Sequence, residues 1–158
     1  MPGMRGAGGL ALFVGLAAVA LAAPAAAQTC HGAPTGVRVS LTVQGVRSDK
    51  GNVAAVVFGD DEKRYLKQNG ELETVHDPAV PGTTTLCFWL PKPGNYALFV
   101  FHDANANGEV DTGLLGIPKE GFGFSNNVRP HLSAPSFKST HFTAGPGETS
   151  LSVLLHYR

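Results

Sequence analysis

The chain has 158 residues, of which 43% are hydrophobic, and its 12 basic and 12 acidic side chains balance at neutral pH. A near-neutral chain exerts no general attraction on nucleic acid or anionic lipid, so we expect neither as a partner. The length suits one domain with one hydrophobic core.

The first residues follow the order of a secretory signal peptide. Arg5 supplies a positive charge, residues 10–23 form an almost uninterrupted apolar run, and residues 25–27 are three alanines that fit a cleavage site. The run is short for a membrane span, and no later segment is a candidate. We expect residues 1–27 to be cleaved and residues 28–158 to form a single domain without an integral membrane segment, located in the periplasm or secreted.

Export changes the interpretation of the two cysteines, Cys30 and Cys87. An oxidising compartment favours disulfides, so we expect them to pair and to tie the mature N-terminus to a strand in the middle of the chain. In the chain-entropy model such a loop closure is worth roughly 4 kcal/mol. The alternative is two independent thiols, one exposed near the terminus and one buried.

The dominant pattern of the mature chain is an alternation of apolar and polar residues with period two, which is typical of strands. It is clear over residues 37–43, whereas residues 53–58 are more continuously apolar and are expected to be central in their sheet. Residues 96–102 are largely apolar on both faces and should also be interior. The remaining expected strands are residues 84–90, 137–143 and 151–157, with turns at 48–52 and 91–95.

Two segments interrupt this pattern. Residues 60–72 carry several charges, and we expect a helical turn there around Tyr65 and Leu66, capped by Asp60 or Asp61. Residues 113–127 are rich in glycine and too irregular for a regular element. About seven strands with intervening turns predict an all-β fold, a two-sheet antiparallel sandwich that is immunoglobulin-like or transthyretin-like.

Residues 103–111, the acidic loop, place oxygen-bearing side chains on alternate residues before a glycine and then add a carboxylate. This pattern is typical of loops that bind hard cations, and it predicts a Ca²⁺ site. The loop departs from an EF-hand, because its twelfth position is Leu114 rather than a bidentate Glu. The expected metal ligands are Asp103, Asn105, Asn107 and Asp111.

The same loop has a second interpretation as a well-formed turn without metal. Asn107-Gly108 is a strong turn pair, and Asn and Asp side chains satisfy backbone groups locally. Carboxylates at both ends of the loop favour calcium, since a simple turn does not require them. The missing bidentate ligand opposes calcium unless Glu120 or a carbonyl of the following segment folds back. Both interpretations remain open at the level of sequence.

Residues 113–127, the glycine-rich loop, raise the question of a binding surface, because long irregular loops often carry function. The alternative is a structural role in which the two phenylalanines plug the open end of the sandwich, and we favour it because Phe is more often buried than displayed. The candidate binding residues are Lys119, Glu120, Phe122, Phe124, Ser125 and Asn126.

Four separated motifs carry a resemblance to a known family. They are GVRSDKG at 45–51, PGNYA at 93–97, His102-Asp103 with its asparagine-rich loop, and LGIPKEGFGFSNN at 115–127. Their order resembles the exported bacterial family called domain of unknown function 2141, from about Val37 to the end. The resemblance implies a compact exported β-sandwich whose activity is unassigned. Some members carry more carboxylates in the acidic loop, so Asn105 and Asn107 imply weaker cation binding here.

No set of residues in the sequence identifies a particular catalysed reaction. The six histidines show no His-x-His or His-x-x-x-His spacing, and no Gly-x-Ser-x-Gly elbow is present. The leading hypothesis is a non-enzymatic, exported, calcium-stabilised module with an unknown envelope or extracellular partner. The alternatives are a metal-free structural or interaction protein, and a hydrolase that uses the carboxylates of Asp103, Asp111 and Glu120.

Overall fold

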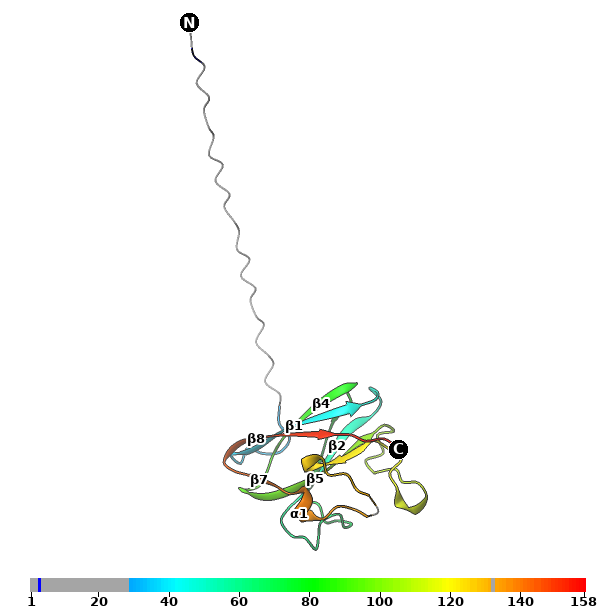
Figure 1. The fold of residues 1–158 in the computed structure, drawn as a ribbon. Helices are drawn as coiled ribbons and strands as arrows, with labels where there is room; N and C mark the ends of the chain where they lie inside the picture. The colour runs from blue at the N-terminus through cyan, green and yellow to red at the C-terminus, as the bar shows by residue number, and fades with distance from the viewer. Residues whose placement is uncertain (1–2, 4–28, 132) are drawn as a thin grey trace.

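The computed structural model describes residues 3, 29–131 and 133–158, so the expected signal peptide, residues 1–27, lies outside the described residues apart from Gly3. The described residues form two sheets that face each other as a sandwich (Figure 1), which confirms the expected all-β fold. The strands are β1 (Val37–Val46), β2 (Asn52–Phe58), β3 (Glu73–Pro78), β4 (Gly82–Trp89), β5 (Gly94–Asp103), β6 (Phe122–Phe124), β7 (Phe142–Ala144) and β8 (Gly147–Leu154), accompanied by α1 (Phe137–Thr140) and the 3-10 turns η1 (Leu114–Gly116) and η2 (Ser125–Asn127).

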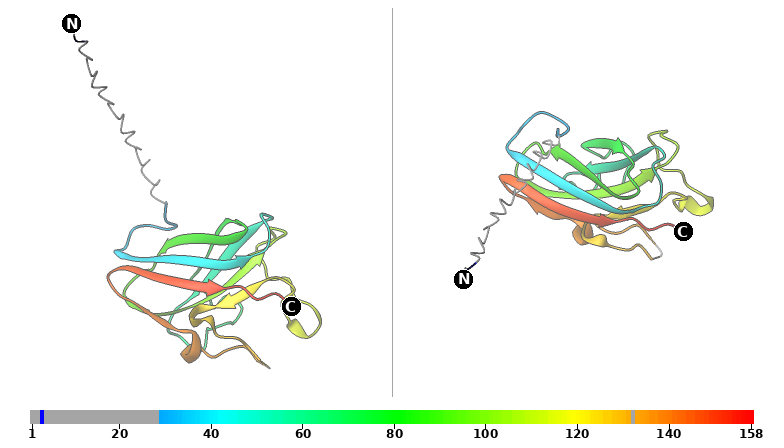
Figure 2. Two further views of the ribbon diagram at one scale, coloured as in Figure 1. Left: turned by 45° about the horizontal axis from the view of Figure 1, so that its top comes forward. Right: turned by 90° about the horizontal axis from the view of Figure 1, so that it is seen from above.

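One sheet has the strand order β4-β1-β8, and the other has the order β3-β2-β5-β6, with β7 also pairing with β5. The pairs are antiparallel except for β1 and β8, which run parallel with Val37 opposite Gly147. Figure 2 shows β1 and β8 side by side in this sheet. The chain enters both strands from the same end, where the Gly147 N–H donates to the Gly36 carbonyl.

The hydrophobic core lies between the two sheets and follows the period-two pattern. Residues 37–43 alternate between buried and partly exposed, as expected, and Val39, Leu41 and Val43 are fully buried. The facing sheet contributes alternate residues of β2 and β5 to the same core. Both strands are also central in their sheet, which explains why their sequences are apolar on both faces.

The five-stranded sheet buries a second apolar surface on its outer face. Phe101, Phe122 and Phe124 cluster there with Ala54, while Tyr65 packs edge-on against Phe58 and Phe137 nearby. Residues of the 60–72 segment and of α1 therefore cover this face. The segment forms consecutive turns rather than a helix, and the Asp61 carboxylate accepts the Lys63 N–H, in keeping with the expected cap.

The structure differs from the sequence-based elements at four places. The last strand, expected at residues 151–157, is β8 and spans Gly147–Leu154. Residues 137–143, expected as one strand, begin as α1, because Ser136 caps the Ser139 N–H and Phe137 and Thr140 fall on one buried face; β7 follows. The polar edge strand β3 was not expected, since only Val75 is buried in it. The glycine-rich loop contains β6, which pairs with β5.

Among the described residues, no helix combines the length and apolar character needed to cross a membrane.

Candidate functional site

Asp103, the last residue of β5, organises the acidic loop from inside the protein. Its side chain is 1% exposed, and its two carboxylate oxygens accept the backbone N–H groups of Asn107 at 3.1 Å and Gly108 at 2.8 Å. The turn before β2 packs against the backbone of Asp103. A Cβ on Gly51 would lie 1.9 Å from the Asp103 carbonyl oxygen, and Gly51 has a φ of +64°, so only glycine fits there.

Glu120 folds back onto the acidic loop and fastens both of its ends. One carboxylate oxygen accepts the Ala104 N–H and the other accepts the Asp111 N–H, both at 3.1 Å. The side chain is 9% exposed. The Lys119 N–H also donates to the Asp111 carbonyl, at 2.8 Å. Glu120 and the Lys119 backbone therefore belong to the acidic loop rather than to a separate binding surface.

The structure brings the four sequence-predicted ligands together. The side-chain amides of Asn105 and Asn107 donate to the two carboxylate oxygens of Asp111, at 2.8 and 3.1 Å. Their own amide oxygens accept the backbone N–H groups of Asn107 and Glu109. The loop thus contains carboxylate and amide oxygens, the donor types that Ca²⁺ prefers, although the amide nitrogens rather than the amide oxygens face Asp111 in this structure.

The donor set and its charge define what this loop can hold. Within residues 29–131 and 133–158, no three His, Cys, Asp or Glu side chains converge as a metal cluster, so a cation here would need oxygens from the asparagines or the backbone as well. The two ion pairs of the described residues involve neither Asp103, Asp111 nor Glu120. These three carboxylates instead accept backbone or side-chain N–H groups.

A buried histidine and tyrosine close the end of the sandwich beside the acidic loop. His102 is 2% exposed, and its Nε2 lies 2.8 Å from the Lys50 carbonyl oxygen, which can only accept. In the neutral imidazole Nε2 therefore carries the proton, and Nδ1 accepts from the Tyr157 hydroxyl at 2.9 Å. The same hydroxyl accepts the Arg47 N–H at 3.2 Å.

Tyr157 is held by its ring as well as by its hydroxyl. The guanidinium carbon of Arg47 lies 4.0 Å from the ring centroid, and Gly121 packs so closely that a Cβ would lie 2.2 Å from the ring. Burial raises the pKa of the Tyr157 phenol, the contacts with Arg47 oppose that rise, and the nearby Glu120 carboxylate adds to it. Tyr157 thus remains a neutral structural donor at ordinary pH.

Phe122 and Phe124 are both 4% exposed, which agrees with burial rather than display. Their position differs from a plug at the open end of the sandwich. In the β5–β6 register, Phe124 stands opposite Phe99 and Phe122 stands opposite Phe101, so all four rings lie on the outer face of the five-stranded sheet. The physical reason is that β6 extends this sheet. A strand of three residues is too short to show a period-two pattern, so the sequence did not predict it.

Ser125 and Asn126 also have structural roles. The Ser125 hydroxyl is buried, accepts the Leu98 N–H and donates to the Thr140 carbonyl. The Asn126 amide donates to the His141 carbonyl at 2.8 Å. These bonds tie η2 to β5 and α1. Of the proposed binding residues in the glycine-rich loop, Lys119 is exposed, and the others are buried or bonded to the protein itself.

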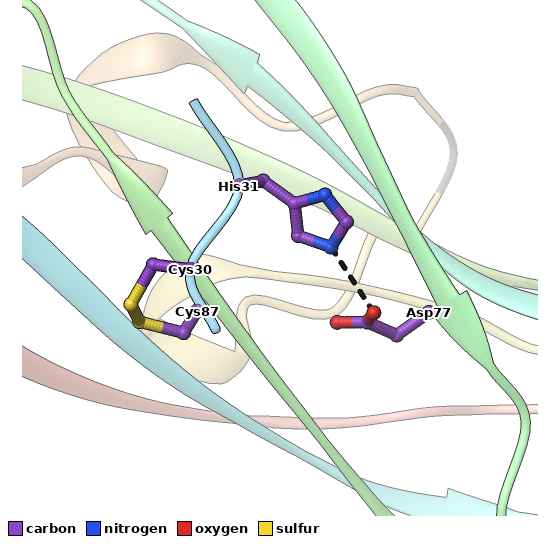
Figure 3. A network of polar contacts seen from close by, with 4 residues as sticks. All are labelled: Cys30, His31, Asp77 and Cys87. Carbon is purple, nitrogen blue, oxygen red and sulfur yellow. Dashed lines mark hydrogen bonds and ion pairs between the residues drawn. A yellow bond between two sulfur atoms is a disulfide. The ribbon is translucent and has the colours of Figure 1, made fainter. Parts of the chain in front are cut away.

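The N-terminal segment bridges the edges of the two sheets (Figure 3). Cys30 and Cys87 lie at disulfide distance, with their Cα atoms 4.5 Å apart. His31 pairs with β4 through bonds to the Cys87 carbonyl and the Trp89 N–H. Its Nε2 lies 3.0 Å from the Asp77 carboxylate on β3. Sequence reasoning missed the role of His31 because its partner lies 46 residues away.

A family model described as an uncharacterised protein conserved in bacteria, DUF2141, matches residues 41–152. This range contains the acidic loop, Glu120 and the Phe122–Asn127 segment. No significant match was found among curated proteins or among solved structures. The match covers most of the chain, which therefore belongs to the uncharacterised bacterial family DUF2141, domain of unknown function 2141.

Proposed function

We propose that this chain is an exported, non-enzymatic β-sandwich protein whose acidic loop binds Ca²⁺, and that it acts as a binding or cell-envelope accessory module. One observation carries the calcium proposal: Asp103 and Glu120 are buried carboxylates at the base of a loop that also holds Asp111, and none of the three is in an ion pair among the described residues. Buried negative charge is costly unless compensated, and a bound cation compensates it.

The residues that would hold the ion are Asp103 and Asp111 through carboxylate oxygens, and Asn105 and Asn107 through amide oxygens. Glu120 keeps the two ends of the loop in place. When bound, Ca²⁺ supplies positive charge and rigidity rather than chemistry. Two neutral amides in the donor set reduce its charge, so the expected affinity is that of extracellular modules, with Kd about 10⁻⁴ to 10⁻³ M.

Thermal melts in excess Ca²⁺ and in chelator test this proposal. A cation that binds only the folded form stabilises it by RT ln(1 + [L]/Kd), about 2.7 kcal/mol at one hundred times Kd. We expect Tm to rise with Ca²⁺ in the wild type and in Asp49→Asn, an exposed turn residue outside the loop. The rise should disappear in Asp111→Asn. An identical Tm in Ca²⁺ and in chelator would remove the calcium site.

A metal-free structural or interaction protein is the second candidate, and a specific observation favours it. Every buried side-chain nitrogen or oxygen among the described residues has a hydrogen-bond partner, and the acidic loop satisfies its polar groups internally. Such a loop is stable as a turn without an ion. The same melts decide between the two candidates, because only the first predicts a calcium-dependent Tm.

We propose no catalytic role for the carboxylates, in contrast to the hydrolase alternative. Asp103 and Glu120 each accept two backbone N–H groups, an environment that holds a carboxylate as a structural acceptor. Proton transfer requires a group within reach of the substrate. A screen against glycan and ester substrates tests this, and turnover that is lost in Glu120→Gln while the fold is retained would restore the hydrolase.

Export is tested separately by the mass of the mature protein recovered from the native cell. We expect cleavage after Ala27 and recovery from the periplasm or the medium. Recovery of the uncleaved chain from the cytoplasm would contradict export and leave the calcium proposal untouched.

A further inference from the structure

A small cavity lies beside the C-terminal residues, and its lining includes no residue of the acidic loop. Its volume is about 250 Å³, and it lies between β6, residues 128–130 and residues 156–158. Paired backbone bonds join its walls, since the Phe122 N–H donates to the His156 carbonyl at 3.0 Å and the His156 N–H donates back at 2.8 Å. Figure 2 shows the C-terminal segment next to β6. The cavity therefore has a fixed wall.

The lining of this cavity is positively charged. Its positive charge comes from Arg129 and Arg158, and no acidic side chain of the described residues lines it. Burial lowers the pKa of His156, and the charge of Arg129 lowers it further, so His156 lies close to Arg129 and stays neutral at ordinary pH. Arg129 and Arg158 are exposed residues of this lining, and guanidinium groups offer planar N–H donors that suit a carboxylate or phosphate group.

The rest of the lining is apolar. The other lining residues are Phe122, Gly123, Val128, Pro130 and Tyr157. A pocket with an apolar wall and a few convergent charged groups is the usual form of a small-molecule site, and this volume lies just below the common range of roughly 300 to 1,000 Å³. The occupant is therefore small, with an apolar or ring body and one anionic group.

We propose that this cavity binds a small organic anion, with its carboxylate or phosphate group held by Arg129 and Arg158 and its body against Val128 and Pro130. The site shares no residue with the acidic loop, so this proposal can be tested independently of the calcium proposal. The two anionic groups share the chemistry that guanidinium recognises, and separate probes distinguish them.

The test is an NMR titration of the isotope-labelled protein in chelator at constant ionic strength. Benzoate and phenyl phosphate are the probes, and benzyl alcohol is the neutral control. We expect saturable shifts at residues 122–123, 128–130 and 156–158 with at least one anion, and none with benzyl alcohol. The tighter of the two anions identifies the natural anionic group.

Variants separate a built site from general electrostatics. Arg129→Gln and Arg158→Gln should each weaken binding about tenfold, since each removes a charged donor. Lys63→Gln removes one charge from the exposed 60–72 segment and should leave affinity within about twofold. The proposal is overturned by an absence of saturable shifts with both anions, by equal losses in Lys63→Gln and Arg129→Gln, or by equal binding of benzyl alcohol.

Discussion

The Tyr157 hydroxyl lies 2.9 Å from Nδ1 of His102, a residue 55 positions earlier in the chain. This contact joins the end of β5 to the residues after β8 and closes one end of the core. Because Nε2 of His102 donates to the Lys50 carbonyl, the Tyr157 hydroxyl is the donor that satisfies Nδ1.

Tyr157→Phe should therefore destabilise the protein by about 1 to 3 kcal/mol, because it leaves the His102 Nδ1 and the Arg47 N–H without their partner. Urea unfolding measures the loss. Tyr96→Phe is the matched control, since its hydroxyl donates a single bond to the Lys92 carbonyl. An equal or smaller loss in Tyr157→Phe would show that the closure contributes little.

Replacing Phe122 or Phe124 by Ala should cost about 3 to 5 kcal/mol each, the usual range for a buried Phe. Both rings pack on the outer face of the five-stranded sheet. Leu114→Ala is the control, because that side chain is 91% exposed and should change stability little. If both Phe variants lose less than about 1 kcal/mol of unfolding free energy, the glycine-rich loop would instead be a candidate binding surface.

The Cys30–Cys87 pair should be a disulfide in protein from the native compartment, and peptide mass spectrometry without reduction detects it. Cys30→Ser with Cys87→Ser should destabilise the fold by roughly 2 to 4 kcal/mol, because the unfolded chain gains freedom. Reduction of the wild type should reproduce that loss. Two free thiols in the native protein, with melts unaffected by reductant, would contradict the pairing.

Stability should depend on pH through Glu73 on β3. Burial raises the pKa of this carboxyl, and the charge of His31 opposes the rise. A raised folded-state pKa means that the contribution of Glu73 to stability is present at low pH and is lost as pH rises through that value. Glu73→Gln should therefore be more stable than the wild type at neutral pH, and the difference should vanish in acid.

Unfolding free energies measured across the acidic and neutral range test this dependence. Glu62→Gln, at an exposed position, serves as the control and should follow the wild type. If Glu73→Gln were less stable than the wild type at neutral pH, the ionised carboxylate would be making a favourable interaction, and the assigned sign would be wrong.

Local patterns predicted the features that are repeated over several residues. The alternation from Val37 to Val43 located β1, and the apolar faces of residues 53–58 and 96–102 placed both strands inside their sheet. The polar strand β3 was missed because an edge strand with one buried Val gives no period-two signal. Helix α1 was missed because one turn of helix contains too few residues to show its period.

The contacts of the candidate site also separate into those that the sequence predicts and those that it does not. Asp103 to Asp111 form one loop, so their proximity follows from the sequence itself. The Tyr157 contact with His102 and the His31 contact with Asp77 depend on how distant strands pair, which a single sequence does not encode locally. The basic cavity draws on residues of three separate segments and is visible only in the folded chain.

Isothermal titration of Ca²⁺ into chelator-treated protein tests the central claim most directly. The proposal predicts one saturable site in the wild type, unchanged binding in Asp49→Asn, and loss of binding in Asp111→Asn, which removes a loop carboxylate while keeping its size. Retention of cooperative unfolding by Asp111→Asn confirms that the loss reflects the site rather than the fold. The absence of saturable binding in the wild type, or equal binding by Asp111→Asn, would contradict the calcium site and leave the acidic loop as a turn.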